Sequence, residues 1–267
     1  MGNLTARLLA AFRAWDRPTR IAFTLALVLL GISIALAFFG PLDVRQPALI
    51  GAGGLFIISQ VIIMWGNRNM VTPYTRAQHA FLEGDFQSAR DLLEAVRSSG
   101  KADVRDLTLL GNIYRQLGDL DASEDSLTEA LRLRPNHHFP LYGFGRTLLI
   151  QGRYTEAVDT ITRALEAGAP PVIQVDLGDA YFRQGVWEEA RVTLKGVRPL
   201  VIEPHRALMV DYLLYRLEQG EPPAPAIIEA GLPYWQAESE RFRHTPYGQA
   251  LADDVRQLQT LGGRANV

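Results

Sequence analysis

The chain has 267 residues, a formal net charge of −2 at pH 7 and no cysteine. The balanced charge argues against a nucleic-acid partner, because nucleic-acid-binding domains usually carry a strong basic excess. The absence of cysteine excludes disulfides, thiolate metal sites and cysteine nucleophiles. The mean hydropathy of zero hides a split between a strongly apolar part before residue 66 and a polar remainder, so we expect an anchor followed by a soluble helical region.

Residues 1–20 form an amphipathic segment. Leu4, Leu8, Phe12 and Trp15 recur at helical spacing, with arginines elsewhere on the wheel, so we predict a helix lying on a membrane surface. A mitochondrial transit peptide has a similar arginine-rich, acid-poor composition. We disfavour that alternative, and also a cleavable signal peptide, because a long apolar run follows directly and a second one comes soon after.

Two uncharged apolar runs, residues 21–39 and 48–65, predict a transmembrane helical hairpin over residues 21–66. At a rise of about 1.5 Å per residue, the first run spans about 30 Å, the thickness of the hydrocarbon core. The segment GPLDVRQP lies between the runs, with Pro41 and Pro47 at either side of a predicted short polar turn. So short a connection requires the two helices to be antiparallel.

Small residues lie where the two spans could meet, which would let the helices approach closely. Gln60 is the only strongly polar side chain in either span, and we favour an interhelical hydrogen bond for it over a contact with a ligand or another subunit. Neither span contains His, Asp, Glu, Lys or Arg, so a proton relay, ion path or histidine-bound haem is not expected. The small residues are Gly31 and Ala35 in the first span and Ala48, Gly51, Ala52 and Gly54 in the second.

Arginines are concentrated before the first predicted span and after the second, and not in the turn between them. Four of them precede the first span, Arg68 and Arg76 follow the second, and the turn holds only Arg45 beside Asp43. By the positive-inside rule, both termini face the cytoplasm. The linker GNRNMVT has seven residues and reaches at most about 24 Å when extended, so it would keep the following domain near the membrane surface.

A repeat follows the linker. The segments LEGD, QLGD, IQGR and RQGV place glycines at Gly84, Gly118, Gly152 and Gly185, at spacings of 34, 34 and 33 residues. Each glycine lies between two helical patterns, where a left-handed residue ends the first helix. Self-similarity at this period predicts stacked helix pairs.

Large and small residues recur at matching positions within the units. The first helices share the sets Leu107, Leu110, Gly111 and Tyr114; Leu141, Phe144, Gly145 and Leu148; and Leu177, Gly178 and Tyr181, while the second helices share the small residues Ala89, Ser123, Ala157 and Ala190. This pattern closely resembles the tetratricopeptide repeat (TPR) over residues 72–204. The resemblance implies an all-α solenoid of about four repeats. It departs in the fourth unit, where Gln174 replaces a large residue and Pro170–Pro171 shorten the spacing, so we expect looser packing there.

Residues 205–267 continue as helix without a clean repeat. We predict one helix ending before Gly220, short helices over 224–230 and 234–243, and a last helix beginning at Thr245–Pro246. An open solenoid end needs such a cap. The alternative is that Tyr234, Trp235, Phe242 and Tyr247 form an aromatic surface for a partner.

No catalytic constellation is present in the sequence. We interpret His137 and His138 as exposed turn residues rather than a metal pair, because no carboxylate lies near them in sequence. The motifs GxxxxGK[ST], GxGxxG, GxSxG and HExxH do not occur. We therefore predict no enzymatic activity, no cofactor and no metal.

The TPR resemblance implies that the first helix of each pair lines a groove that binds protein. Asn112, Arg146 and Arg183 fit part of the clamp with which some members grip a terminal carboxylate, but the lysines are absent and Asp179 opposes an anion. We therefore expect a mixed aromatic and polar groove for a peptide or helix. Carried over by position, the groove residues are Arg105, Thr108, Asn112, Arg115, Phe139, Tyr142, Arg146, Leu149, Val175, Asp179, Phe182 and Arg183.

The favoured function is that of an adaptor or assembly factor which holds partner proteins at the membrane surface. The alternative is a permanent accessory or scaffold subunit of a larger membrane complex. An enzyme is disfavoured because no segment remains to house an active site. Arginine carries nearly all the positive charge, which is typical of a GC-rich bacterial genome, so we expect a bacterial inner-membrane protein with its lipid-embedded hairpin and cytoplasmic repeats.

Overall fold

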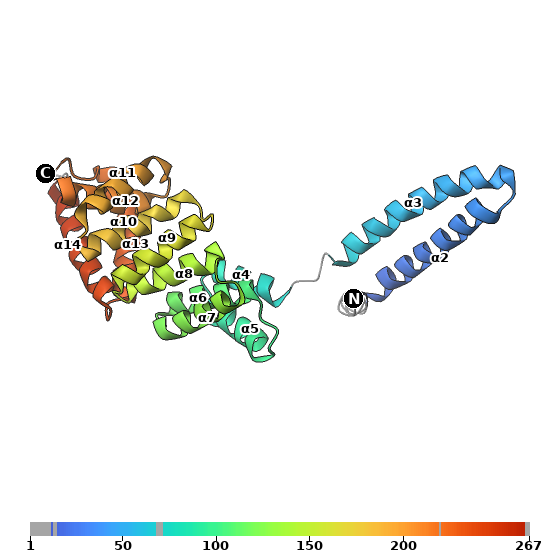
Figure 1. Ribbon diagram of the computed structural model, residues 1–267, viewed down its shortest axis with the longest axis horizontal. Helices are drawn as coiled ribbons and strands as arrows, with labels where there is room; N and C mark the ends of the chain where they lie inside the picture. Colours follow the sequence, from blue (N-terminus) through green and yellow to red (C-terminus); the bar gives the residue numbers. More distant parts are fainter. Residues whose placement is uncertain (1–11, 13–14, 68–71, 219, 265–267) are drawn as a thin grey trace. The chain divides into compact units, whose positions relative to one another are not determined.

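The computed structural model describes residues 12, 15–67, 72–218 and 220–264, and every regular element in these ranges is helical (Figure 1). The chain divides into two units, Met1–Thr72 and Pro73–Val267. The first unit contains two long apolar helices, and the second contains the repeats and the C-terminal helices. The predicted all-α class is confirmed. Most of the amphipathic segment and part of the linker lie outside the described residues.

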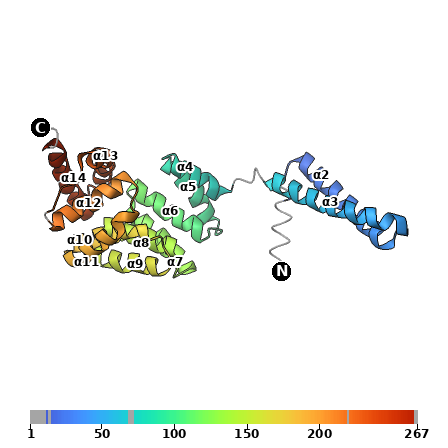
Figure 2. The same cartoon turned by 90° about the horizontal axis from the view of Figure 1, so that it is seen from above.

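Helices α2 (Arg17–Phe39) and α3 (Leu42–Asn67) lie side by side as a hairpin (Figure 2). Only Gly40 and Pro41 connect them, and Arg45 Nε donates a hydrogen bond of 3.0 Å to the carbonyl of Gly40. The predicted turn over residues 40–47 is therefore too long. Pro47 lies inside α3, where it removes one intrahelical hydrogen bond without ending the helix.

The two hairpin helices meet along a seam whose residues recur at steps of four and three, as in left-handed helix pairs. Ala26 and Ala37 of α2 and Ser59 of α3 are buried in it. Small side chains at these positions bring the helix axes close together. The least exposed residues of the seam are Thr19, Phe23, Ala26, Leu30, Ser33 and Ala37 in α2, and Val44, Ala48, Ala52, Leu55 and Ser59 in α3.

The predicted small-residue contacts are only partly correct. Ala48 and Ala52 lie on the seam, but Gly31, Ala35 and Gly54 are exposed on the outer faces. A Cβ atom added at Gly31 or Gly54 would meet nothing within 4 Å. Ala26 and Ala37 of α2 face α3. Gly31 and Ala35 lie at other angles around α2, so they face away from α3.

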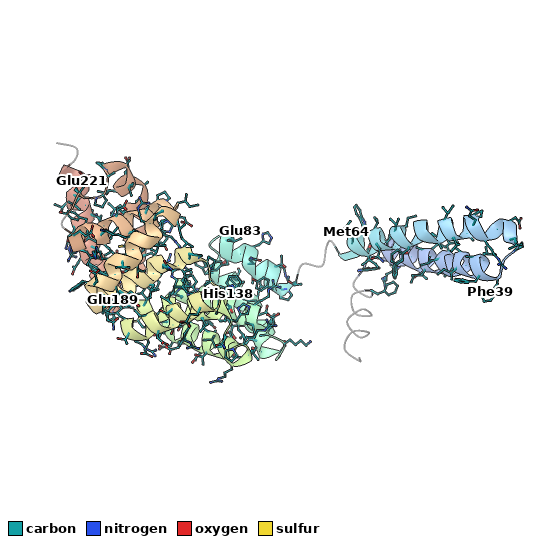
Figure 3. The ribbon with its side chains drawn as sticks, turned by 45° about the horizontal axis from the view of Figure 1, so that its top comes forward. Phe39, Met64, Glu83, His138, Glu189 and Glu221 are labelled. Carbon is teal, nitrogen blue, oxygen red and sulfur yellow. The ribbon has the colours of Figure 1, made fainter. Side chains whose placement is uncertain are left out.

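The outer faces of the hairpin are apolar. Both helices are long and apolar enough to cross a membrane, and Figure 3 shows Phe39 and Met64 near opposite ends of the hairpin. Gln60 is also exposed, and no hydrogen bond joins it to another described residue. The favoured interhelical hydrogen bond of Gln60 is therefore wrong, because its position lies off the seam. Trp15 is buried at the open end, where a Cβ atom at Gly66 would lie 2.7 Å from its ring.

The second unit begins with four helix pairs that stack in order, and each helix packs mainly on its sequence neighbours (Figure 1). The predicted turn glycines Gly84, Gly118, Gly152 and Gly185 have φ values of 82°, 81°, 82° and 84°, which confirms their left-handed role. The pairs are α4 (Pro73–Leu82) with α5 (Phe86–Ser98), α6 (Val104–Leu117) with α7 (Leu120–Leu133), α8 (His138–Ile150) with α9 (Tyr154–Glu166), and α10 (Gln174–Gln184) with α11 (Trp187–Val197).

Close contact within each pair depends on the predicted small residues. A Cβ atom at Gly145 would lie 2.5 Å from Cγ1 of Ile161 on the partner helix, and Gly111 and Gly178 are equally tight against leucines. Ser123 replaces the usual alanine in the second pair, and its hydroxyl donates a hydrogen bond of 2.8 Å to the Gly111 carbonyl. The buried hydroxyl is thus satisfied where the helices touch.

The fourth repeat is packed more tightly than its sequence suggests. Pro170 precedes a 3₁₀ turn, η1 (Pro171–Ile173), that leads into α10. Ile173 is 4% exposed and packs in one apolar cluster with Leu141 and Ile161. It fills the space left by Gln174, so the expected looseness is absent.

Three more helices follow the repeats: α12 (Pro204–Glu218), α13 (Pro225–Arg241) and α14 (Pro246–Arg264). α13 is a single helix with Pro233 inside it, so the two short helices predicted here are wrong. Trp235, Phe242 and Tyr247 are 7%, 2% and 5% exposed and belong to the largest apolar cluster. Their burial fits the capping role and removes these three residues from the alternative aromatic docking surface, while Tyr234 is half-buried against His205.

Candidate partner-binding groove

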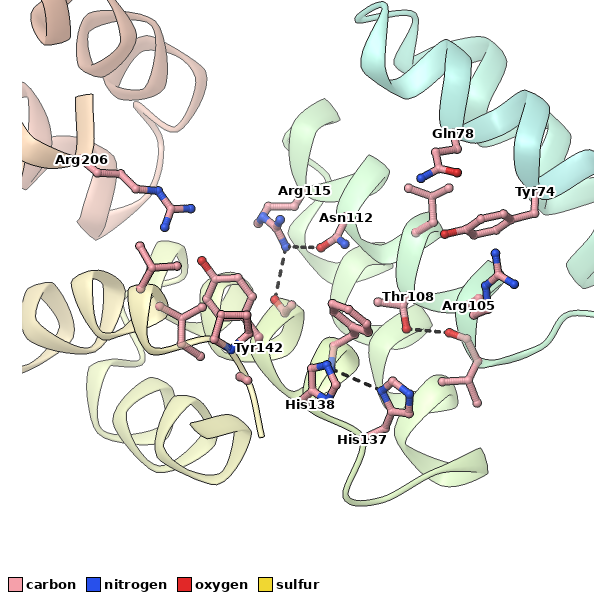
Figure 4. A pocket seen from close by; sticks show the side chains of 18 residues that line it. Tyr74, Gln78, Arg105, Thr108, Asn112, Arg115, His137, His138, Tyr142 and Arg206 are labelled. Carbon is pink, nitrogen blue, oxygen red and sulfur yellow. Dashed lines mark hydrogen bonds between the residues drawn. The ribbon is translucent and has the colours of Figure 1, made fainter. Parts of the chain in front are cut away.

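The first helices of the repeats line an open pocket of about 640 Å³, a size typical of ligand sites. Figure 4 shows side chains from α4, α6, α8 and α12 that converge on it. Six of the predicted groove residues line the pocket: Arg105, Thr108, Asn112, Arg115, Phe139 and Tyr142. These residues are brought together as the TPR resemblance implied, and their role in binding stays a prediction.

One wall of the pocket is apolar and the other is polar. Phe139 is 60% exposed, and its ring lies 4.2 Å from that of His138. Val172 and Ile173 from η1 continue the apolar wall. Tyr142 is held by a hydrogen bond of 2.5 Å from its hydroxyl to Asp176, and burial raises its pKa above the ordinary range of tyrosine. This wall is therefore apolar, and the hydrogen bond holds Tyr142 in place within it.

Arg115 lies on the polar wall and is only 5% exposed. Its Nη1 donates hydrogen bonds of 2.9 Å to Asn112 Oδ1 and 3.3 Å to the Gly143 carbonyl, both of which are neutral acceptors. Burial lowers the pKa of Arg115 to about 10, and the charge of Arg146 contributes to this lowering. The guanidinium still carries its charge at neutral pH.

The other half of the predicted groove is covered by the chain itself. Arg183 on α10 pairs with Asp179 at 2.8 Å and with Asp254 on α14 at 2.6 Å, and its side chain is 6% exposed. Tyr247 of α14 donates a hydrogen bond of 2.7 Å to Asp179. Burial lowers the pKa of Arg183, but the two carboxylates outweigh burial and raise it above its ordinary value. α14 therefore occupies the position expected for a bound helix.

The remaining predicted groove residues are buried or partly buried. Leu149 and Val175 are buried in the apolar cluster of the cap. Arg146 lies 3.5 Å from Asp176, with its side chain 20% exposed. Phe182 is half-buried against Trp187. Sequence reasoning did not foresee this cover, because the contacting residues on α10 and α14 are about 70 positions apart and obey no period.

Arg206 on α12 also lines the pocket, and sequence reasoning missed it. The repeat period would have identified it. Equivalent positions lie 34, 33 and 34 residues apart at Arg105, Phe139, Val172 and Arg206, so α12 continues the series of first helices. Tyr212 occupies the position that is glycine in the second, third and fourth units, so the repeat pattern is not recognisable in α12 from that position. Tyr74 and Gln78 on α4, and His137 and His138 at the start of α8, complete the polar rim.

Two models of the tetratricopeptide repeat match the chain, at residues 103–168 and 142–195. The repeats are tetratricopeptide repeats. PilF from Pseudomonas aeruginosa has a similar solved structure at 16% identity, covering 70% of this chain and 95% of that chain, with a TM-score of 0.50. At this identity the likeness shows the fold alone.

Two further solved structures have lower TM-scores. A fragment of MamA from Desulfovibrio magneticus RS-1 is 18% identical, covers 72% of this chain and 94% of that one, and has a TM-score of 0.43. A thermophilic TPR protein from Thermus thermophilus is 18% identical, covers 65% and 90%, and has a TM-score of 0.44. No curated protein sequence matches the chain.

Replacing Arg183 tests how firmly α14 covers the groove. Arg183→Met leaves buried Asp179 without its cation and leaves Asp254 with only Arg216, 3.4 Å away and partly exposed, so we expect the free energy of unfolding to fall by about 3–5 kcal/mol. The matched control is Arg256→Met, since Arg256 pairs with Asp253 on the exposed side of α14. Denaturant unfolding of the full chain in detergent would measure both, and equal small changes would contradict a firm cover.

Proposed function

We propose that this chain is a membrane-anchored TPR adaptor or assembly factor, which holds a partner protein at the membrane surface through the open half of its groove. The observation that carries the proposal is the open pocket lined by the first helices of the repeats, in a chain that also bears a long apolar hairpin. TPR domains bind protein partners and are generally non-enzymatic. Among the described residues, no group of three or more His, Asp or Glu side chains could hold a metal ion.

The hairpin supports the membrane anchor. Its outward side chains are large and apolar, and Phe39 and Ile50 are 89% and 72% exposed. A surface of this kind would aggregate in water and is stable in lipid. The arginines that flank the hairpin favour cytoplasmic termini and cytoplasmic repeats. The repeat region begins at Pro73, six residues after α3 ends at Asn67, so a partner bound there would itself be a membrane protein or work at the membrane.

One observation favours the second candidate, a permanent subunit of a membrane complex. Gln60 faces outward from the hairpin, and an unpaired amide is unfavourable in hydrocarbon. A neighbouring membrane helix with a polar side chain would satisfy it.

Cysteine labelling tests the anchor and its orientation, because the chain has no cysteine of its own. Asp43→Cys places a thiol beside the hairpin turn, and Ser88→Cys places one in the repeats. In intact cells, a membrane-impermeant maleimide should label position 43 and should reach position 88 only after lysis. Labelling of both positions before lysis, or of position 88 alone, would contradict the proposed topology.

Affinity purification from native membranes in mild detergent tests the groove. Phe139→Ala removes an exposed ring from the pocket, and Trp187→Ala removes an exposed ring from α11 outside it as the matched control. We expect substoichiometric partners that are reduced severalfold by the first variant and retained by the second. A fixed, equimolar set of membrane proteins retained by both variants would favour the permanent subunit, and the absence of any partner would count against both functions.

A further inference from the structure

The charged side chains that line the open pocket are all basic. Its lining contains Arg105, Arg115 and Arg206 together with His137 and His138, and no Asp or Glu. The whole chain has a net charge of −2, so the positive lining does not follow from composition. Within the part of the chain that the structure describes, none of the three arginines forms an ion pair.

Arg115 is the unusual member of this group. Arg183 is buried to a similar degree, but two carboxylates neutralise it. Arg115 is buried with only the neutral oxygens of Asn112 and Gly143 as hydrogen-bond partners. The carboxylates of Asp176 and Glu238 favour its charged form, but burial outweighs them and neither forms an ion pair with it. A buried cation without a paired carboxylate lowers the stability of a fold. Its place at the wall of an open pocket leaves room for an anion from outside the chain to pair with it.

Arg206 and Arg105 extend the positive wall on either side. Arg206 approaches from α12 and Arg115 from α6, and Figure 4 shows both beside Tyr142. Arg105 lies with its guanidinium 4.2 Å from the ring centre of Tyr74, a stacking that holds it in place while leaving its N–H groups free to donate. Arg115 and Arg206 are neighbours along this wall, and two neighbouring guanidiniums can bind one carboxylate with charge-assisted hydrogen bonds.

We propose that the pocket binds an acidic segment of the partner protein, with a side-chain carboxylate between Arg115 and Arg206 and a neighbouring apolar side chain against Phe139. The proposal rests on the adaptor function and specifies the chemistry of its partner. Phe139, Val172 and Ile173 form the apolar wall next to the arginines. An acidic residue adjacent to a large apolar one therefore fits the pocket better than a purely acidic run.

The test uses the full chain in detergent micelles and a fluorescein-labelled peptide, Gly-Glu-Leu-Glu-Phe-Glu-Gly, amidated so that it has no terminal carboxylate. Its matched control replaces each Glu with Gln. Fluorescence anisotropy should show at least about tenfold tighter binding of the Glu peptide, weakening as salt screens the charges. Equal binding of the two peptides, or no binding of the Glu peptide, would overturn the proposal.

Arg115→Gln provides the decisive variant, with Arg163→Gln on the exposed face of α9 as its control. Arg115→Gln should abolish the preference for the Glu peptide while the unfolding midpoint stays the same or rises, because an unpaired buried charge is removed. A lower midpoint with unchanged peptide preference would show a purely structural role. Competition by inorganic phosphate at the peptide's own concentration would indicate a small-anion site instead and overturn the acidic-segment assignment.

The same variant separates this proposal from the adaptor function. Partners that are purified with the wild-type chain and lost with Phe139→Ala, but retained with Arg115→Gln, would leave the groove as the binding site and reject its acidic specificity. Loss of the partners with both variants is the expected result.

Discussion

Arg183 joins one carboxylate from α10 to one from α14, and this buried ion triad decides which part of the TPR groove stays open. Three charges that are removed from water favour the fold only when all are present and well placed. Tyr247 completes the arrangement through its hydrogen bond to Asp179. α14 consequently fills the C-terminal half of the groove, and the half that Arg115, Phe139 and Tyr142 line stays open.

Arg183 and Arg115 differ in how their buried charges are compensated, and this difference underlies the role proposed for Arg115. Both are nearly enclosed, but Arg183 has its counter-charges within the chain, whereas Arg115 has only neutral acceptors. The carboxylates raise the pKa of Arg183, and burial lowers that of Arg115. An arrangement that weakens the isolated protein is expected where binding supplies the missing charge.

Local periodicity made most of the fold predictable. The glycines at the turns and at Gly111, Gly145 and Gly178 are required by backbone conformation or by close contact, so their spacing reveals the repeats directly. The hairpin was predictable from two apolar runs, but the rotation of α2 was not, because Gly31 and Ala26 are equally suited to a helix contact by composition. Pro47 was misread for a related reason, since a proline one turn inside a helix leaves no clear sign in the sequence.

The candidate site was only half predictable. Carrying the groove positions of the TPR family over to this sequence identified five residues that line the pocket: Arg105, Asn112, Arg115, Phe139 and Tyr142. This succeeded because the location of these residues depends on the repeat alone. The same transfer also selected Asp179, Phe182 and Arg183, which contacts with the C-terminal helices cover or engage. It selected Arg146 as well, which pairs with Asp176 on α10. A non-repeating helix that folds back over the repeats has no periodic signal. The mixed aromatic and polar character of the open half agrees with the prediction, and its occupancy by a partner remains to be tested.

Photo-crosslinking in native membranes would test the central claim most directly. A benzoylphenylalanine in place of Phe139 lies in the open half of the groove, and one in place of Trp187 lies outside it. We expect position 139 to crosslink to a membrane protein or membrane-associated protein and position 187 not to do so. Crosslinks of equal yield from both positions, or from position 187 alone, would contradict a partner bound in the open half of the groove.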